Sequence, residues 1–384
     1  MIEESQYIYY FSFGVAFVCV AVLYLKIKST ESIVITTKEF KNFQSNFLIG
    51  YVLIMLGELV AIGSFYHTMV LINLSLDKIT KLYVITLISS TSFGILLDIV
   101  DIGSKRNKCI ACAFLYTISM TTVYFGAHFE LLLLGRVVYG AASSLLHTTF
   151  DTYLINEHSS LGFPDDWLNQ TFSMLTHSMA LVSALSGVIG QTTARFSALG
   201  PIFVCVALFL FVTIFIVLSW GKDLSGSRFM ISGFVLSMKK LYNASLSNKL
   251  VGNIVMLSAC CEASITIFTF YWAPWLTSVN IDKYPISSFP YELIFSTYLA
   301  GSMVGAYFYQ IVQASVGQDN LFQITLVGLS ASYFLGAVFH TPLMVFGVSL
   351  VIHFFHGMYW PSVGHCRGTV ILPEMRSSSL CMSK

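Results

Sequence analysis

Residues 130–155 read ELLLLGRVVYGAASSLLHTTFDTYLI, and this stretch decides what kind of protein the chain is. It is apolar over more than the roughly 20 residues that a helix needs to cross a bilayer. It nevertheless carries an arginine and an aspartate well inside its bounds. At 3.6 residues per turn, one face of the helix collects small or polar residues: Arg136, Gly140, Ser143, His147 and Asp151. The stretch therefore predicts a membrane span with one small or polar face.

The composition of the whole chain agrees with this prediction. Its 384 residues are 56% hydrophobic and 10% charged, whereas an ordinary globular chain is about 25% charged. A water-soluble fold needs a polar skin that this composition does not supply. Soluble enzymes and nucleic-acid-binding proteins are therefore excluded. The net charge of +1 also gives no field that attracts a polyanion, so no nucleic-acid partner is expected.

Eleven apolar runs are long enough to predict membrane-spanning helices. They are 7–25, 47–70, 82–98, 109–127, 130–155, 172–193, 200–219, 249–272, 293–313, 321–340 and 343–363. When the loop 26–46 is placed in the cytoplasm, most of the 20 basic residues fall on the cytoplasmic side, as the positive-inside rule requires. Asn73-Leu74-Ser75, a glycosylation sequon, then lies on the opposite side. The expected protein is an all-α, polytopic membrane protein.

The longest polar break, 220–248, is basic and divides the spans into two groups. We therefore predict an extra N-terminal membrane helix with a basic cytoplasmic loop (1–46) and an N-terminal six-helix bundle (47–219). A central cytoplasmic loop (220–248) and a C-terminal bundle of four helices with a tail (249–384) follow. Two helical bundles joined by a central loop resemble the plan of the major facilitator superfamily.

Two local motifs also resemble that superfamily. The run from Gly135 to Ala142, GRVVYGAA, is similar to the motif of its fourth helix, and the stretch 93–107 is similar to its loop between the second and third helices. Such a loop places an acid and cations at neighbouring helix ends, where ion pairs hold one gating state. The candidate gating residues are Gly94, Asp98, Asp101, Lys105 and Arg106. Either aspartate fits the motif, and the basic residues satisfy the positive-inside rule even without a gating role.

A closer resemblance extends over residues 40–376. Its carriers are Gly135, Arg136, Phe150, Asp151, Glu157, His158, Phe163, Pro164, Trp167, Thr171, Phe172, Glu262, Trp272, Ala273, Pro274, the run Gly357 to Ser362, Arg367, Pro373 and Glu374. They resemble the molybdate-anion transporter family, the major facilitator superfamily domain-containing protein 5 type. The resemblance implies uptake of molybdate across the cell membrane by alternating access. Members of that family continue through two more helices, so this chain looks truncated at its C-terminus.

Ionisable residues inside spans are the strongest indication of a site, because each costs about 2.5–3.5 kcal/mol at the centre of a membrane helix. The predicted substrate-binding or coupling residues are Arg136, Glu58, Asp151, Glu262, Tyr139 and Ser143. A guanidinium keeps its proton and donates two parallel hydrogen bonds to a tetrahedral oxyanion. Hydroxyls add neutral donors, and buried carboxylates carry coupling protons. The alternative interpretation is structural, with Arg136 paired to an acid only to hold the bundle together.

The remaining patterns predict no cofactor, no metal site and no enzyme. The chain lacks the HExxH, GxSG and GxGD motifs of intramembrane proteases and the GxxxxGK[ST] phosphate loop. The expected partners are molybdate or a similar tetrahedral oxyanion and the lipid bilayer, and the oligomeric state is left open. Two other functions also stay open: a shortened, non-transporting form with a binding or regulatory role, and a major facilitator for another small solute. Small residues such as Gly301 and Gly305 predict close helix contacts.

Overall fold

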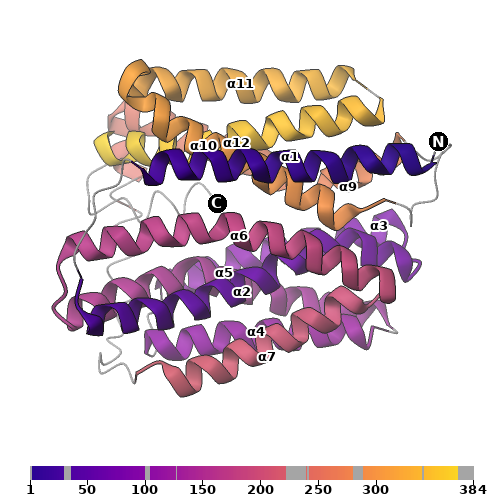
Figure 1. Ribbon diagram of the computed structural model, residues 1–384, viewed down its shortest axis with the longest axis horizontal. Coiled ribbons are helices and arrows are strands. Elements are labelled where there is room, and N and C mark those ends of the chain that lie inside the picture. Colours follow the sequence, from indigo (N-terminus) through magenta and orange to yellow (C-terminus); the bar gives the residue numbers. More distant parts are fainter. Residues whose placement is uncertain are drawn as a thin grey trace. The chain divides into compact units, whose positions relative to one another are not determined.

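Eleven long helices make up most of the computed structural model, which describes residues 2–29, 36–99, 104–126, 128–221, 239, 242–279, 289–339 and 341–370. They are α1 Ile2–Lys28, α2 Lys38–Leu71, α3 Leu76–Ile99, α4 Lys105–Tyr124, α5 Phe129–Ser160, α6 Asp165–Phe196, α7 Gly200–Ser219, α9 Lys249–Ser278, α10 Tyr291–Val316, α11 Gln318–Val338 and α12 Pro342–Val370 (Figure 1). Each predicted span corresponds to one helix. The prediction of an all-α, polytopic fold is therefore confirmed.

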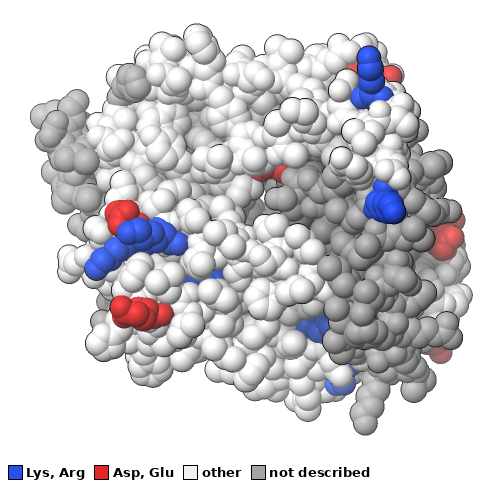
Figure 2. Space-filling model, turned by 180° about the vertical axis from the view of Figure 1, so that it is seen from behind, with Lys and Arg blue, Asp and Glu red and all other residues white. Residues whose placement is uncertain are grey.

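Most of these helices suit a membrane crossing. Within the described residues, nine have the length and apolar composition that a span needs. Of the two others, α4 carries Lys105, Arg106 and Lys108 in its first turns, and α10 begins with Tyr291 and Glu292. The described surface visible in Figure 2 is mostly uncharged. A surface of this kind suits the hydrocarbon of a bilayer, where exposed charges are costly.

The compact unit Ser32–Ile231, which we call the N-terminal unit, contains α2 to α7. Within it, α5 packs against α3 and α4, α4 packs against α7, and α2 packs against α6 and α7. Glycines permit the closest contacts. A Cβ on Gly140 would overlap the backbone of α3 at Thr86, and one on Gly57 would come within 2.7 Å of the Phe209 ring on α7. These contacts fix the rotation of α2 and α5 about their axes, which decides which side chains meet inside the unit.

The helix α2 begins at Lys38, well before the predicted span start at residue 47. The Thr37 side chain caps the helix by accepting a hydrogen bond from the Phe40 backbone N–H, with an N···O distance of 3.3 Å. Phe40 is fully buried, and its ring centre lies 5.2 Å from that of Phe163 and 4.9 Å from that of Trp167. Hydropathy marks the apolar span alone, whereas the cap and this aromatic packing extend the helix beyond it.

The second compact unit, which we call the C-terminal unit, combines Met1–Glu31 with Ser232–Lys384. Its first helix, α1, packs along α10, and α12 packs against both α10 and α11. Tyr9 anchors α1, since its ring centre lies 5.1 Å from that of Phe346 and 6.2 Å from that of Phe289. The helix that the sequence left outside both bundles thus packs on the second one. The boundaries predicted between the bundles stay predictions.

The helices α10 and α12 approach each other most closely at two glycines. A Cβ on Gly305 would overlap the carbonyl oxygen of Phe354, and a Cβ on Gly357 would overlap the carbonyl oxygen of Ser302. Each glycine therefore lies against the backbone of the opposite helix. The close contact predicted for Gly301 and Gly305 is confirmed at Gly305, and a Cβ on Gly301 would lie 3.1 Å from the Leu350 side chain.

Candidate functional site

Arg136 lies in the interior of the N-terminal unit between two aromatic rings. It is 6% exposed. Its guanidinium carbon lies 3.8 Å from the centre of the Phe65 ring and 5.1 Å from that of Tyr139. A desolvated guanidinium over an aromatic face gains about 2 kcal/mol. No acidic side chain in the described residues forms an ion pair with Arg136. The described contacts therefore give no support to the interpretation of Arg136 as half of a structural ion pair.

The backbone of α5 around Arg136 is held by small residues and hydroxyls of the neighbouring helices. On the α4 side, Ser119 Oγ donates to the Gly135 carbonyl oxygen at 2.8 Å. On the α3 side, Ser89 Oγ donates to the Val137 carbonyl oxygen at 2.6 Å. These bonds occupy carbonyls on both sides of Arg136 and fix the direction in which its side chain leaves the helix. The backbone of α5 that carries Arg136 is thus held in place by both neighbouring helices.

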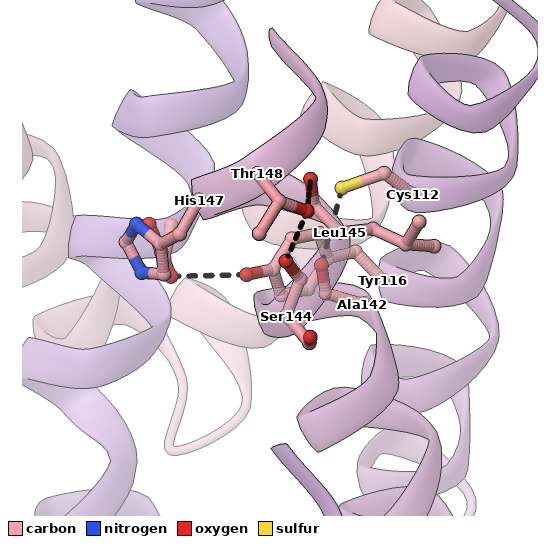
Figure 3. Close-up of polar contacts among 8 residues, drawn as sticks. Cys112, Tyr116, Ala142, Ser144, Leu145, His147 and Thr148 are labelled. Atoms are coloured by element: carbon pink, nitrogen blue, oxygen red, sulfur yellow. Dashed lines mark hydrogen bonds and ion pairs between the residues drawn. The ribbon is translucent and has the colours of Figure 1, made fainter. Parts of the chain in front are cut away.

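Glu58, on α2, is the buried acid of the same unit. It is 3% exposed, and its Oε1 accepts a hydrogen bond from the Tyr116 hydroxyl at 2.9 Å. The Nε2 atom of His147, on α5, lies 3.9 Å from the same oxygen, and the His147 side chain is 55% exposed. Figure 3 shows Tyr116 pointing from α4 toward α5, on the side where His147 lies. A buried phenol therefore binds the carboxylate on one side, and a half-exposed imidazole reaches it on the other.

Tyr139 is a buried phenol on α5, one turn from Arg136. It interacts electrostatically with both Glu58 and Arg136, and its ring centre lies 5.1 Å from that of Tyr116. Its hydroxyl is buried and has no hydrogen-bond partner in the described residues. A buried polar group without a partner costs about 1–3 kcal/mol. We call Glu58, Tyr116, Arg136, Tyr139 and His147 the N-terminal polar cluster.

The structure places the other predicted residues of this unit at the margin of the N-terminal polar cluster. Ser143 is half-buried on α5. Asp151 is exposed and interacts electrostatically with His147, one turn away, and with Tyr51 of α2. The polar face predicted for residues 130–155 therefore runs from a buried cation to an exposed acid.

Replacement of Tyr116 by phenylalanine tests the bond to Glu58. The Tyr116 ring stacks on Phe209, with ring centres 4.7 Å apart, so phenylalanine keeps the packing and removes only the donor. Hydrogen bonds to charged groups contribute about 1.5–3 kcal/mol. We expect the variant to lose about that much unfolding free energy, measured by thermal unfolding in detergent. The matched control is Tyr124→Phe, whose ring is half exposed; equal stability of the two variants would contradict the prediction.

The predicted site residue of the C-terminal unit, Glu262, has a cationic partner. Its Oε1 accepts a hydrogen bond from the Arg367 Nη2 atom at 2.7 Å, and the side chains of Arg367 and Glu262 are 8% and 11% exposed. The predicted span ended at residue 363, whereas α12 continues to Val370 and carries Arg367 inside the helix. The buried glutamate of the C-terminal unit is thus paired with an arginine, whereas Glu58 of the N-terminal unit accepts a hydrogen bond from a tyrosine.

The predicted gating loop lies partly outside the described residues. Asp101 and the side chain of Asp98 are not described. Gly94 is half-buried on α3. Arg106 donates from Nη2 to the Val217 carbonyl oxygen in the last turn of α7 at 2.7 Å, and Lys105 is half-buried. The described contact of Arg106 is therefore with the C-terminal end of a helix, where a cation is favoured, and a gating role for the loop stays a prediction.

Three members of these sites were not among the predicted site residues. Tyr116 gives no signal in sequence, because one tyrosine in an apolar span resembles any other. His147 lies on the predicted polar face but lacks a permanent charge. Arg367 entered the sequence argument only as part of a family motif. Arg367 lies beyond residue 363, the predicted end of the span, so it was counted outside the membrane.

The comparisons with known proteins concern the family and the fold of the chain. The profile of a protein family described as sugar transporters with 12 transmembrane segments matches residues 7–357. The chain is 24% identical to the molybdate-anion transporter of Takifugu rubripes over 91% of this chain and 78% of that protein. It is 23% identical to the molybdate-anion transporter of Danio rerio over 93% of this chain and 79% of that protein.

Among solved structures, the crystal structure of the nucleoside transporter NupG is similar to this chain with a TM-score of 0.67. The match covers 88% of this chain and 86% of that chain at 15% sequence identity. At this level of identity the likeness concerns the fold alone.

Proposed function

Because the chain belongs to the major facilitator family described as sugar transporters with 12 transmembrane segments, and is a multi-pass membrane transporter, we propose that its substrate is a tetrahedral oxyanion, molybdate first among them. In this proposal it takes up the anion across the cell membrane as a secondary transporter that works by alternating access. The names of the relatives support molybdate, and the chemistry of the N-terminal polar cluster supports an oxyanion.

The observation that carries the proposal is the position of the Arg136 guanidinium beside Tyr139, 5.1 Å from the centre of its ring. The guanidinium is buried between two rings with no acidic partner in the described residues, and the neighbouring hydroxyl is buried without a hydrogen-bond partner there. An oxyanion accepts two parallel N–H donors from an arginine, and a third from a hydroxyl. A neutral sugar offers no charge to compensate the buried cation. Ser143, half-buried on the same helix, supplies a further donor in this proposal.

The acids have a separate role in the proposal. Asp151, which is exposed, and Glu58, which is buried, bind and release protons during uptake, and His147 conducts them between the two carboxylates. The distances support this role, because His147 reaches within 3.9 Å of the Glu58 carboxylate and interacts with Asp151. The residues Gly94, Asp98, Asp101, Lys105 and Arg106 form the gating loop that stabilises one access state.

Uptake of labelled molybdate into cells that lack their own molybdate transporter tests the proposal. The cells express this chain, and its insertion in the cell membrane is verified by surface labelling. We expect saturable uptake that tungstate, a tetrahedral dianion, inhibits, and that D-xylose leaves unchanged. Inhibition of molybdate uptake by sulfate and by phosphate then shows how the charge and the size of an oxyanion affect its binding.

Two outcomes would overturn the proposal. A correctly inserted chain that moves no molybdate is not a molybdate transporter. Molybdate uptake that xylose suppresses and tungstate does not would place the substrate among neutral solutes, where the buried guanidinium has no anion to bind.

A further inference from the structure

The ion pair of the C-terminal unit is unusually well desolvated for two charges. Arg367 and Glu262 are 2.7 Å apart, and their side chains are 8% and 11% exposed. Taking two charges out of water costs several kcal/mol per ion, and apolar residues often replace a buried pair without loss of stability. Stability alone is therefore a weak reason to keep such a pair. Glu262 lies well inside α9, whereas Arg367 lies in the last turn of α12, and an ionisable group inside a membrane span is by default a pointer to function.

The two units carry the same pair of charges on corresponding helices. The N-terminal unit has Glu58 on its first helix, α2, and Arg136 on its fourth, α5. The C-terminal unit, α1 apart, has Glu262 on its first helix, α9, and Arg367 on its fourth, α12. Halves of major facilitators are structural repeats. The glutamate and the arginine are held separately in the N-terminal unit and are joined in the C-terminal unit, so the corresponding helices of the two units show two different arrangements.

The contact between α9 and α12 depends on polar groups. The helix α12 packs much more extensively on α10 and α11 than on α9. Tyr359 donates from its hydroxyl to the Ser258 carbonyl oxygen at 3.4 Å, and the Ser258 hydroxyl is buried without a partner in the described residues. Pro361 lies inside α12 and removes a backbone hydrogen bond before the turns that carry Arg367. These turns are therefore held to α9 by contacts that an anion is able to replace.

We infer that Arg367 is the oxyanion-binding residue of the C-terminal unit and that Glu262 is its resident counter-anion, which the substrate displaces. This inference rests on the proposed function. When the dianion binds Arg367, the Glu262 carboxylate loses its cation and takes up one proton. When the dianion leaves, Glu262 releases that proton and pairs with Arg367 again. One proton therefore moves with each dianion, and the transported net charge is one negative charge instead of two.

Several other ionisable groups lie around the pair of Glu262 and Arg367. Tyr359 of α12 and Cys261 of α9 interact electrostatically with Glu262. Farther out, Cys366 interacts with Asp319 of α11, and Tyr333 of α11 interacts with Cys261. From α10, Tyr309 interacts with Cys366. Of these groups, Glu262 is the one that forms an ion pair with Arg367, so the proton exchange is assigned to its carboxylate.

Molybdate transport by the purified full chain in proteoliposomes tests the inference. An inward gradient of about one pH unit supports about tenfold accumulation per coupled proton. We expect this stimulation in the unchanged protein and its loss in Glu262→Gln. That variant should still exchange external for internal molybdate, with KM lowered about tenfold, because the resident competitor is gone. Arg367→Gln should lose both exchange and accumulation. Glu262→Asp keeps a carboxylate and should keep proton-driven accumulation, even if the glutamine variant fails to fold.

A reciprocal exchange separates this role from a structural one. Glu262→Arg with Arg367→Glu restores an ion pair and with it the unfolding midpoint, and we expect it not to restore transport. Asp77→Asn removes one partner of the exposed pair between Lys81 and Asp77 and should change neither property. Proton-driven transport by the reciprocal variant, or by Glu262→Gln, would overturn the inference while the proposed function stands. An unchanged protein that moves no molybdate would overturn both.

Discussion

Replacing Arg136 by alanine is expected to reduce molybdate uptake about 100-fold or more, while the protein still folds and reaches the membrane. Truncating one partner of a desolvated, hydrogen-bonded charge pair costs about 2–5 kcal/mol, which corresponds to a factor of about 30 to several thousand. Here the lost partner is the only arginine that the described residues place inside the N-terminal unit between aromatic rings. No acid in the described residues is left unpaired by its removal. The loss should therefore fall on substrate binding rather than on stability.

Two further variants identify what the guanidinium contributes. Arg136→Lys keeps the positive charge but loses the planar fork and the stacking on Phe65, so an intermediate loss of about tenfold is expected, mainly in KM. Tyr139→Phe removes the hydroxyl without a partner and keeps the ring beside Arg136. If that hydroxyl binds substrate, KM rises without a loss of stability.

The measurement is initial uptake of labelled molybdate over a range of concentrations, normalised to the protein at the cell surface. Arg195→Ala is the matched control, because Arg195 is exposed in the last turn of α6. Full uptake by the alanine variant would remove Arg136 from the substrate site. A variant that never reaches the surface would instead show that Arg136 is needed for folding, in agreement with the structural interpretation and against the predicted binding role.

The sequence was sufficient to predict the spans and some of the charged residues of each site. Helix-length apolar runs are long and repeated, so the eleven spans follow from composition alone. Arg136, Glu58 and Glu262 were predicted because a charge inside an apolar run is rare. Their partners were not predictable in this way. Which of many tyrosines faces Glu58 depends on the rotations of α2 and α4 about their axes. Close contacts with Phe209 of α7, at Gly57 and at Tyr116, set these rotations.

The ends of helices and their neighbours were the least predictable features. The predicted span ended at residue 363, whereas α12 continues to Val370 and brings Arg367 to Glu262. The position of α1 could not be predicted either, because an apolar helix has no polar or charged face that indicates which helix it packs against. Tyr9 packs on residues more than 270 positions away in the chain, Phe289 and Phe346, and no local pattern encodes such a contact.

Replacement of Gly357 by alanine is expected to destabilise the C-terminal unit by about 2–3 kcal/mol, although alanine is the better helix former. The added methyl group would overlap the Ser302 carbonyl oxygen of α10, and the reciprocal glycine, Gly305, lies against the Phe354 carbonyl oxygen. Both obstacles are backbone atoms, which cannot rotate away as a side chain does. The helices α10 and α12 must therefore separate, and in a membrane bundle close packing at small residues is a main source of helix association.

Gly347→Ala is the matched control, because it lies on the same helix and a Cβ there meets no atom within 4 Å. In the control, the unfolding free energy should stay the same or rise by up to about 1 kcal/mol, since alanine restricts the unfolded chain. Hydrogen exchange of the purified protein locates the effect. Faster exchange in α10 and α12 with unchanged exchange in α2 to α7 is expected, because the two glycines belong to the C-terminal unit. Equal stability of the Gly357 and Gly347 variants would mean that the backbones of α10 and α12 do not meet at these residues.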